Sequence, residues 1–196
     1  MKSFLGTGLA ASLLLGLVVL GLPPAARATS PTDCANVGMD FADADAEKRC
    51  ESGDAGDSQW RGSEQIMIVQ GSGYFLYVSR LKSGYQSYVS EEEVGDFANS
   101  FMKDLLRSPS TVRAHAAVSG YHVATFSGKF GKKSDSDVVC FAFTRYGGVV
   151  LGARGGFSGA PGTANGLYGG YCAKGTEALS DTAIQQVLTD LRAPVD

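Results

Sequence analysis

The strongest β-sheet signal in the chain runs from Asp137 to Arg154, with the sequence Asp-Val-Val-Cys-Phe-Ala-Phe-Thr-Arg-Tyr-Gly-Gly-Val-Val-Leu-Gly-Ala-Arg. β-Branched and aromatic residues fill two short runs, and Tyr146-Gly147-Gly148 between them supplies the positive-φ positions that a hairpin turn needs. The first run, residues 138–143, is apolar on both faces. We therefore expect it to form the central strand of a sheet that is covered above and below.

Other apolar runs predict further hairpins. Residues 66–79 are interrupted by Gly71-Ser72-Gly73, and residues 112–127 by Ser119-Gly120. We also expect the last strand to span Leu167 to Cys172. Because hairpins dominate, these runs favour an antiparallel sheet.

Two amphipathic helices complete the pattern. Ser90 and the three glutamates after it are typical of a capping box, and the helix is predicted to end near Arg107. Ser180 is the predicted N-cap of a second helix, in which apolar residues recur at i, i+3, i+4 and i+7. The expected fold class is α+β, a mainly antiparallel twisted sheet with two packed helices, stabilised by disulfides.

Residues 1–28 have the features of a signal peptide. Lys2 precedes an uncharged apolar run over residues 4–22, and Ala26-Arg27-Ala28 places small residues where a signal peptidase reads them. We expect cleavage after Ala28 and an exported protein. A retained membrane anchor is the alternative, because the run is close to the roughly 20 residues that span a bilayer.

The charge of the chain argues against two classes of partner. Removing Lys2 and Arg27 from the 17 basic residues leaves 15 against 20 acidic ones, a net charge of about −5. Such a chain has no electrostatic reason to bind nucleic acid or anionic lipid. After cleavage we also expect no integral membrane span.

Four cysteines follow the predicted cleavage site, and an even number in an exported chain indicates two disulfides. Three connectivities are possible. We favour Cys34 with Cys50, which bracket one local segment, and Cys140 with Cys172, which lie in the sheet region. No Cys-x-x-Cys occurs, so we expect no metal site and no cofactor.

The predicted domain boundaries follow composition. Residues 29–61 are acidic and rich in small residues, which indicates an arm with a local disulfide and one or two helical turns near Asp43 to Cys50. Residues 62–196 would form a single α+β domain. Within it, Gly155 to Gly170 is glycine-rich and too long for a tight turn, and we expect a mobile loop there.

The search for catalytic residues returns one candidate pair, His115 and His122. An antiparallel hairpin centred on Ser119-Gly120 would place them roughly opposite each other, where they could bind a metal or act as a general base. The alternative is that they are ordinary strand residues, because no nearby cysteines or carboxylates complete a site. We assign no catalytic residue.

Aromatic side chains suggest a binding surface instead. Tyr74, Tyr77, Tyr85 and Tyr88 cluster within fifteen residues and lie close to Arg80. Exposed tyrosines beside a cation suit a protein or sugar partner. Cross-strand aromatic pairs on a half-buried strand are the structural alternative.

The last sixty residues carry one resemblance. Val139-Cys140-Phe141 and Gly170-Tyr171-Cys172, followed by a short amphipathic helix, resemble exported bacterial proteins of unknown activity that end in a Tyr-Cys strand and one helix. The resemblance implies a periplasmic or secreted setting and a bridge between Cys140 and Cys172.

These observations favour an exported, non-enzymatic binding protein whose partner is a protein or a component of the cell envelope. A narrower alternative is an inhibitor or immunity protein for a cell-wall enzyme. The alternative from another class is a small hydrolase or metal-dependent enzyme that uses His115 and His122.

Overall fold

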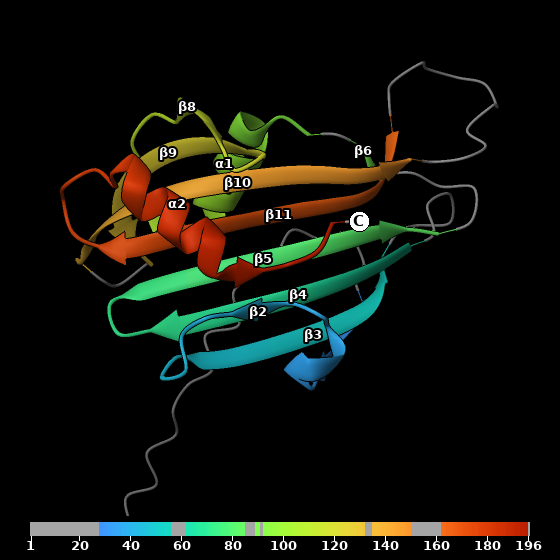
Figure 1. Ribbon diagram of the computed structural model, residues 1–196. Helices are drawn as coiled ribbons and strands as arrows, with labels where there is room; N and C mark the ends of the chain where they lie inside the picture. Colours follow the sequence, from blue (N-terminus) through green and yellow to red (C-terminus); the bar gives the residue numbers. More distant parts are fainter. Residues whose placement is uncertain are drawn as a thin grey trace, which may run out of the picture.

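The computed structural model describes residues 28–55, 62–84, 89–90, 92–131, 135–149 and 162–195. These residues form one ten-stranded sheet, a separate two-stranded sheet, two α-helices and a short 3-10 helix (Figure 1). The strands are β1 (Ala28–Thr32), β2 (Asp40–Phe41), β3 (Glu47–Ala55), β4 (Gly62–Gly71), β5 (Tyr74–Ser83), β6 (Val89–Ser90), β7 (Leu106–Arg107), β8 (Arg113–Val118), β9 (Tyr121–Phe130), β10 (Asp137–Val149), β11 (Gly162–Lys174) and β12 (Leu191–Arg192). The helices are η1 (Cys34–Asn36), α1 (Val94–Leu105) and α2 (Asp181–Asp190).

The large sheet runs in the order β1-β3-β4-β5-β11-β10-β9-β7, with β6 added to β11 and β8 added to β9. Every pairing among the described strands is antiparallel, which confirms the predicted sheet type. β10 lies between β9 and β11, and residues 138–144 are buried. The apolar run at 138–143 is therefore a central strand covered on both faces, as predicted.

The turn predicted at Tyr146-Gly147-Gly148 is wrong. β10 continues through these residues and pairs with β11 as far as Val149 opposite Thr163. A side chain at Gly147 would have its Cβ 2.1 Å from the carbonyl oxygen of Val195. This glycine is needed because the C-terminal segment crosses the strand, so its presence does not signal a turn.

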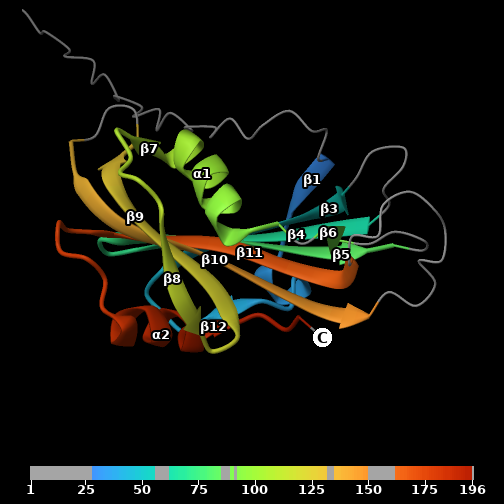
Figure 2. The same ribbon diagram turned by 90° about the horizontal axis from the view of Figure 1, so that it is seen from above.

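The two faces of the sheet carry different layers (Figure 2). One face, the α2 face, packs Phe141, Phe143 and Leu167 against Ile184 and Leu188 of α2. The segments η1 to β2 and β12 to Val195 contribute to the same core. The opposite face, the α1 face, packs strands β9, β10 and β11 beneath α1.

β11 takes up much of the segment that was predicted to be mobile. Residues 162–170 are strand, and residues 150–161 lie outside the described part of the chain. A Cβ at Gly169 would lie 2.2 Å from Phe143 Cζ, and one at Gly170 would lie 2.3 Å from Phe101 Cε1. The two glycines therefore let an aromatic ring lie directly on each face of the strand, which composition alone does not reveal.

The acidic segment after residue 28 is part of the sheet rather than an arm. β3 pairs with β1 on one side and β4 on the other, and residues 47–50 are strand where helical turns were expected. Four side chains of the segment are buried in the core on the α2 face, namely Val37, Met39, Phe41 and Cys50. Their apolar contribution is hidden in the sequence because acidic and small residues separate them.

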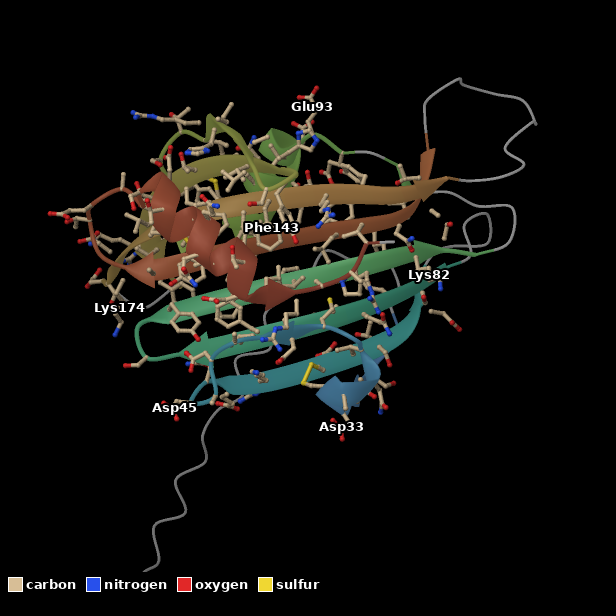
Figure 3. All side chains as sticks on the ribbon, in the orientation of Figure 1. Asp33, Asp45, Lys82, Glu93, Phe143 and Lys174 are labelled. Atoms are coloured by element: carbon tan, nitrogen blue, oxygen red, sulfur yellow. A yellow bond between two sulfur atoms is a disulfide. The ribbon has the colours of Figure 1, made fainter. Side chains whose placement is uncertain are left out.

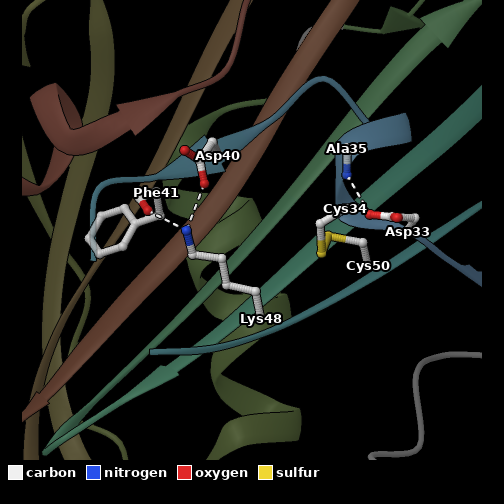
Figure 4. Close-up of a disulfide and its surroundings, with 7 residues drawn as sticks. All are labelled: Asp33, Cys34, Ala35, Asp40, Phe41, Lys48 and Cys50. Carbon is white, nitrogen blue, oxygen red and sulfur yellow. Dashed lines mark hydrogen bonds and ion pairs between the residues drawn. A yellow bond between two sulfur atoms is a disulfide. The ribbon is translucent and has the colours of Figure 1, made fainter. Parts of the chain in front are cut away.

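Both predicted disulfides are present. Cys34 and Cys50 tie η1 to β3, with a Cα–Cα distance of 5.1 Å (Figure 4). Lys48, on the same strand as Cys50, donates to Asp40 Oδ1 at 2.7 Å and to the Phe41 carbonyl at 2.7 Å. Cys140 and Cys172 face each other across β10 and β11, with a Cα–Cα distance of 4.1 Å. The pairing by sequence proximity and sheet position was therefore correct.

The helices begin in different ways. Ser180 Oγ accepts a hydrogen bond from the Ala183 amide at 3.2 Å, which confirms the predicted cap of α2. The N-cap of α1 is Glu93, whose side chain makes no capping bond, and Ser90 belongs to β6 instead. α1 ends at Leu105, close to the predicted boundary, and passes directly into β7.

Candidate functional site

The structure does not bring His115 and His122 together. His115 lies on β8 opposite Val123, whose side chain belongs to the core of the α2 face. His122 precedes Val123 on β9, so its side chain points to the other face, where it is exposed opposite Thr144. The two imidazoles therefore lie on opposite sides of the sheet.

The described part of the chain shows neither a metal-binding cluster nor a membrane-spanning helix. No group of three or more histidine, cysteine, aspartate or glutamate residues there is arranged to hold a metal ion. Among the described helices, none has the length and apolar character needed to cross a membrane.

The tyrosines of β5 also lie on different faces. Tyr74 stacks on Tyr171, with ring centroids 5.5 Å apart, on the α2 face, and its hydroxyl donates to Asp43. Burial and this hydrogen bond raise the pKa of Tyr74, and the same hydrogen bond lowers the pKa of Asp43. Tyr77 lies on the α1 face, with its ring 6.0 Å from that of Phe101.

The other members of the predicted surface do not join these tyrosines. Arg80 is on the α2 face, where its guanidinium donates to Gln65 and to the backbone carbonyls of Val37 (2.7 Å) and Pro194 (3.4 Å). Its contacts hold the N-terminal and C-terminal segments of the covering layer to β5. Tyr85 and Tyr88 lie outside the described residues.

The α1 face instead carries a continuous series of rings, which we call the aromatic stripe. It consists of Tyr77, Phe101, Phe97, Tyr168 and Tyr146. Successive ring centroids are 6.0, 5.9, 5.7 and 5.7 Å apart, within the range of favourable aromatic contacts. Tyr168 is buried, whereas the other four rings are only half-buried. The stripe therefore offers accessible aromatic surface.

Helical spacing and strand pairing position the stripe. Phe97 and Phe101 are four residues apart and share one side of α1. Gly170 on β11 lies directly beneath Phe101 and leaves room for its ring. At the far end, the Tyr146 hydroxyl accepts from the Glu92 amide at 2.6 Å and donates to the Glu92 carbonyl at 2.6 Å. Burial raises the pKa of Tyr146, so the hydroxyl stays protonated at neutral pH.

A row of polar side chains crosses the same face beside the stripe. Ser79, Tyr168, Thr144 and His122 are successive register partners on β5, β11, β10 and β9, so they project from one face. Ser79 Oγ also donates to Glu64 Oε1 at 2.7 Å. We call the buried residues Glu64, Ser79, Thr144 and Tyr168 the polar row. His122 is exposed and is not included. All four are buried, and Glu64 and Thr144 are fully enclosed.

A fully enclosed glutamate is unusual, because removing a carboxylate from water is costly unless polar groups surround it. Glu64 is not among the site residues predicted from the sequence. Glu64 stands at the start of an apolar strand, and an acidic residue there is normally solvated. The period-2 pattern could have indicated it, because Glu64, Ile66 and Ile68 share a face.

Side chains crowd both faces of the sheet (Figure 3). Phe143 is seen beside α2, whereas Glu93 marks the start of α1 at the upper edge. The candidate site lies on the α1 face, where Phe97 and Phe101 of α1 meet side chains of β5 and β11, and it includes Tyr146 of β10 and Glu64 of β4. It combines half-buried rings with buried hydroxyls and one carboxylate, as ligand sites commonly do.

The chain matches no protein-family model, and no curated protein or solved structure is significantly similar to it.

Proposed function

We propose that this is an exported, non-enzymatic binding protein that holds a saccharide of the cell envelope against the aromatic stripe. The observation that carries the proposal is the half-buried series Tyr77, Phe101, Phe97 and Tyr146 beside the buried polar row. Two disulfides support the exported setting, because such bonds persist in oxidising compartments.

The chemistry of the site suits a ring ligand with hydroxyl groups. The apolar C–H face of a sugar ring packs on an aromatic ring, and its hydroxyls exchange hydrogen bonds with hydroxyls and carboxylates. Tyrosine provides both functions, because its ring is apolar and its hydroxyl is a donor and an acceptor. Tyr168 belongs to both the stripe and the polar row, and its register partners are Ser79 and Thr144.

Titration calorimetry with a panel of soluble oligosaccharides from bacterial envelopes tests the proposal. We expect Tyr77→Ala to weaken binding about tenfold or more, a loss of about 1.4 kcal/mol. Tyr74→Ala is the matched control, because Tyr74 is a half-buried tyrosine on the other face of the same strand. It should leave the affinity within about twofold, the range that a neutral substitution gives.

Two results would contradict the proposal. Equal losses in the two variants would show that binding depends on general stability rather than on the stripe. If no saccharide of the panel binds the correctly folded protein, the proposed ligand class is wrong.

A further inference from the structure

His115 connects the edge of the large sheet to the second helix. Its Nε2 lies 3.1 Å from Asp181 Oδ1, at the first residue of α2, and its Nδ1 lies 2.8 Å from the carbonyl oxygen of Ala116. The side chain is 19% exposed. Both ring nitrogens therefore face oxygen acceptors within hydrogen-bond distance.

This arrangement requires two protons on the ring. A neutral imidazole carries one N–H, so one nitrogen would present its lone pair to an oxygen. If Nδ1 keeps the proton and donates to Ala116, the lone pair of Nε2 faces the Asp181 carboxylate. Only the imidazolium donates to both oxygens, and it also forms a charge-assisted bond with Asp181.

The charged groups around the ring are few among the described residues. Asp181 faces it from α2, and Arg113 shares its face of β8 two residues away. From β9, the residue opposite is the uncharged Val123, and the nearby Tyr121 ring is covered by the Arg145 guanidinium at 5.3 Å. The hydrogen bonds to Ala116 and Asp181 outweigh partial burial and raise the pKa of His115.

We propose that protonation of His115 is a pH-sensitive switch that fastens the edge strand β8 to α2. β8 pairs with β9 through one edge only, and no described strand pairs with its other edge. Its register is also interrupted between His115 and Val118. The contact with Asp181 therefore holds a strand whose one strand partner among the described residues is β9.

The direction of the pH dependence follows from linkage. A group whose pKa is raised on folding stabilises the folded state fully below its unfolded value, near 6.5, and loses that effect as the pH rises through the folded value. β8 should be fastened below about pH 6.5 and released as the pH rises through the folded-state pKa of His115.

NMR titration of the imidazole protons tests the switch in the oxidised protein. The signals of His115 should titrate above pH 6.5, and Asp181→Asn should move their midpoint to lower pH. His122 is the internal reference, since it lies on the opposite face, and its signals should not respond to Asp181→Asn. In parallel, hydrogen-exchange protection of the amides of Ala114 to Val118 should fall across the His115 titration.

A second variant makes the result decisive. In His115→Gln, which cannot titrate, protection of the β8 amides should be independent of pH between 5 and 8. The proposal is overturned if β8 protection in the unsubstituted protein does not follow the His115 midpoint. It is also overturned if Asp181→Asn leaves that midpoint unchanged.

Discussion

At the scale of single residues, the glycines of β11 decide where the aromatic rings lie. Gly169 leaves space for Phe143 on the α2 face, and Gly170 leaves space for Phe101 on the α1 face. The same strand therefore supports the main core on one side and the aromatic stripe on the other. The packing of β11 therefore requires glycines, although a glycine-rich composition is typical of a loop.

Gly170→Ala should destabilise the protein by about 1–3 kcal/mol, because the added methyl group would overlap the Phe101 ring. Gly95→Ala is the matched control in α1, where a Cβ has no neighbour within 4 Å. It should be neutral or stabilising by up to about 1 kcal/mol, through helix propensity. Urea unfolding of the oxidised protein measures both, and a neutral Gly170→Ala variant would refute the packing role of this glycine.

At the scale of elements, the sequence patterns predicted strands and helices where local signals dominate. The hairpin of β4 and β5, the pair β8 and β9, the central run of β10 and the cap of α2 follow from alternation, turn residues and capping. The glycines at Gly147 and in β11 are typical of turns and loops, but they allow close contacts with residues distant in sequence, which local patterns do not reveal. The acidic segment was misjudged because its strands are stabilised by pairing and a disulfide, not by local propensity.

The candidate site was less predictable than the fold. The tyrosines and histidines were selected by their proximity in sequence, and strand alternation separates Tyr74 from Tyr77 and His115 from His122. The stripe instead combines residues of β5, α1, β10 and β11. Such a grouping depends on register across strands that are far apart in the chain, which one sequence does not specify.

The N-caps of α1 and α2 allow a test of how capping contributes to stability. Ser180→Ala should lower the free energy of unfolding by about 1 kcal/mol, because it removes the hydroxyl that accepts from Ala183. Glu93→Asp should raise it by about 0.5–1 kcal/mol, because the shorter acid can cap α1 while its charge stays at the positive end of the helix dipole. Thermal unfolding followed by circular dichroism measures both changes. Shifts in the same direction would contradict this account of the caps.

At the scale of the whole molecule, the large sheet carries a different layer on each face. The α2 face is closed by η1, β2, α2 and the C-terminal segment, and the contacts of Arg80 with Val37 and Pro194 hold that layer in place. On the α1 face, α1 lies over β9 to β11, and its half-buried rings Phe97 and Phe101 join Tyr77 of β5 and Tyr146 of β10. This difference between the layers supports our proposal that the α1 face binds a ligand.

The measurement that tests this proposal most directly is NMR mapping of amide shifts during titration with an envelope oligosaccharide. We expect the largest changes at Tyr77, Phe97, Phe101 and Tyr168, with little change in α2 or around Arg80. Changes centred on α2 and the C-terminal segment, with none along the aromatic stripe, would contradict the assignment of binding to the α1 face.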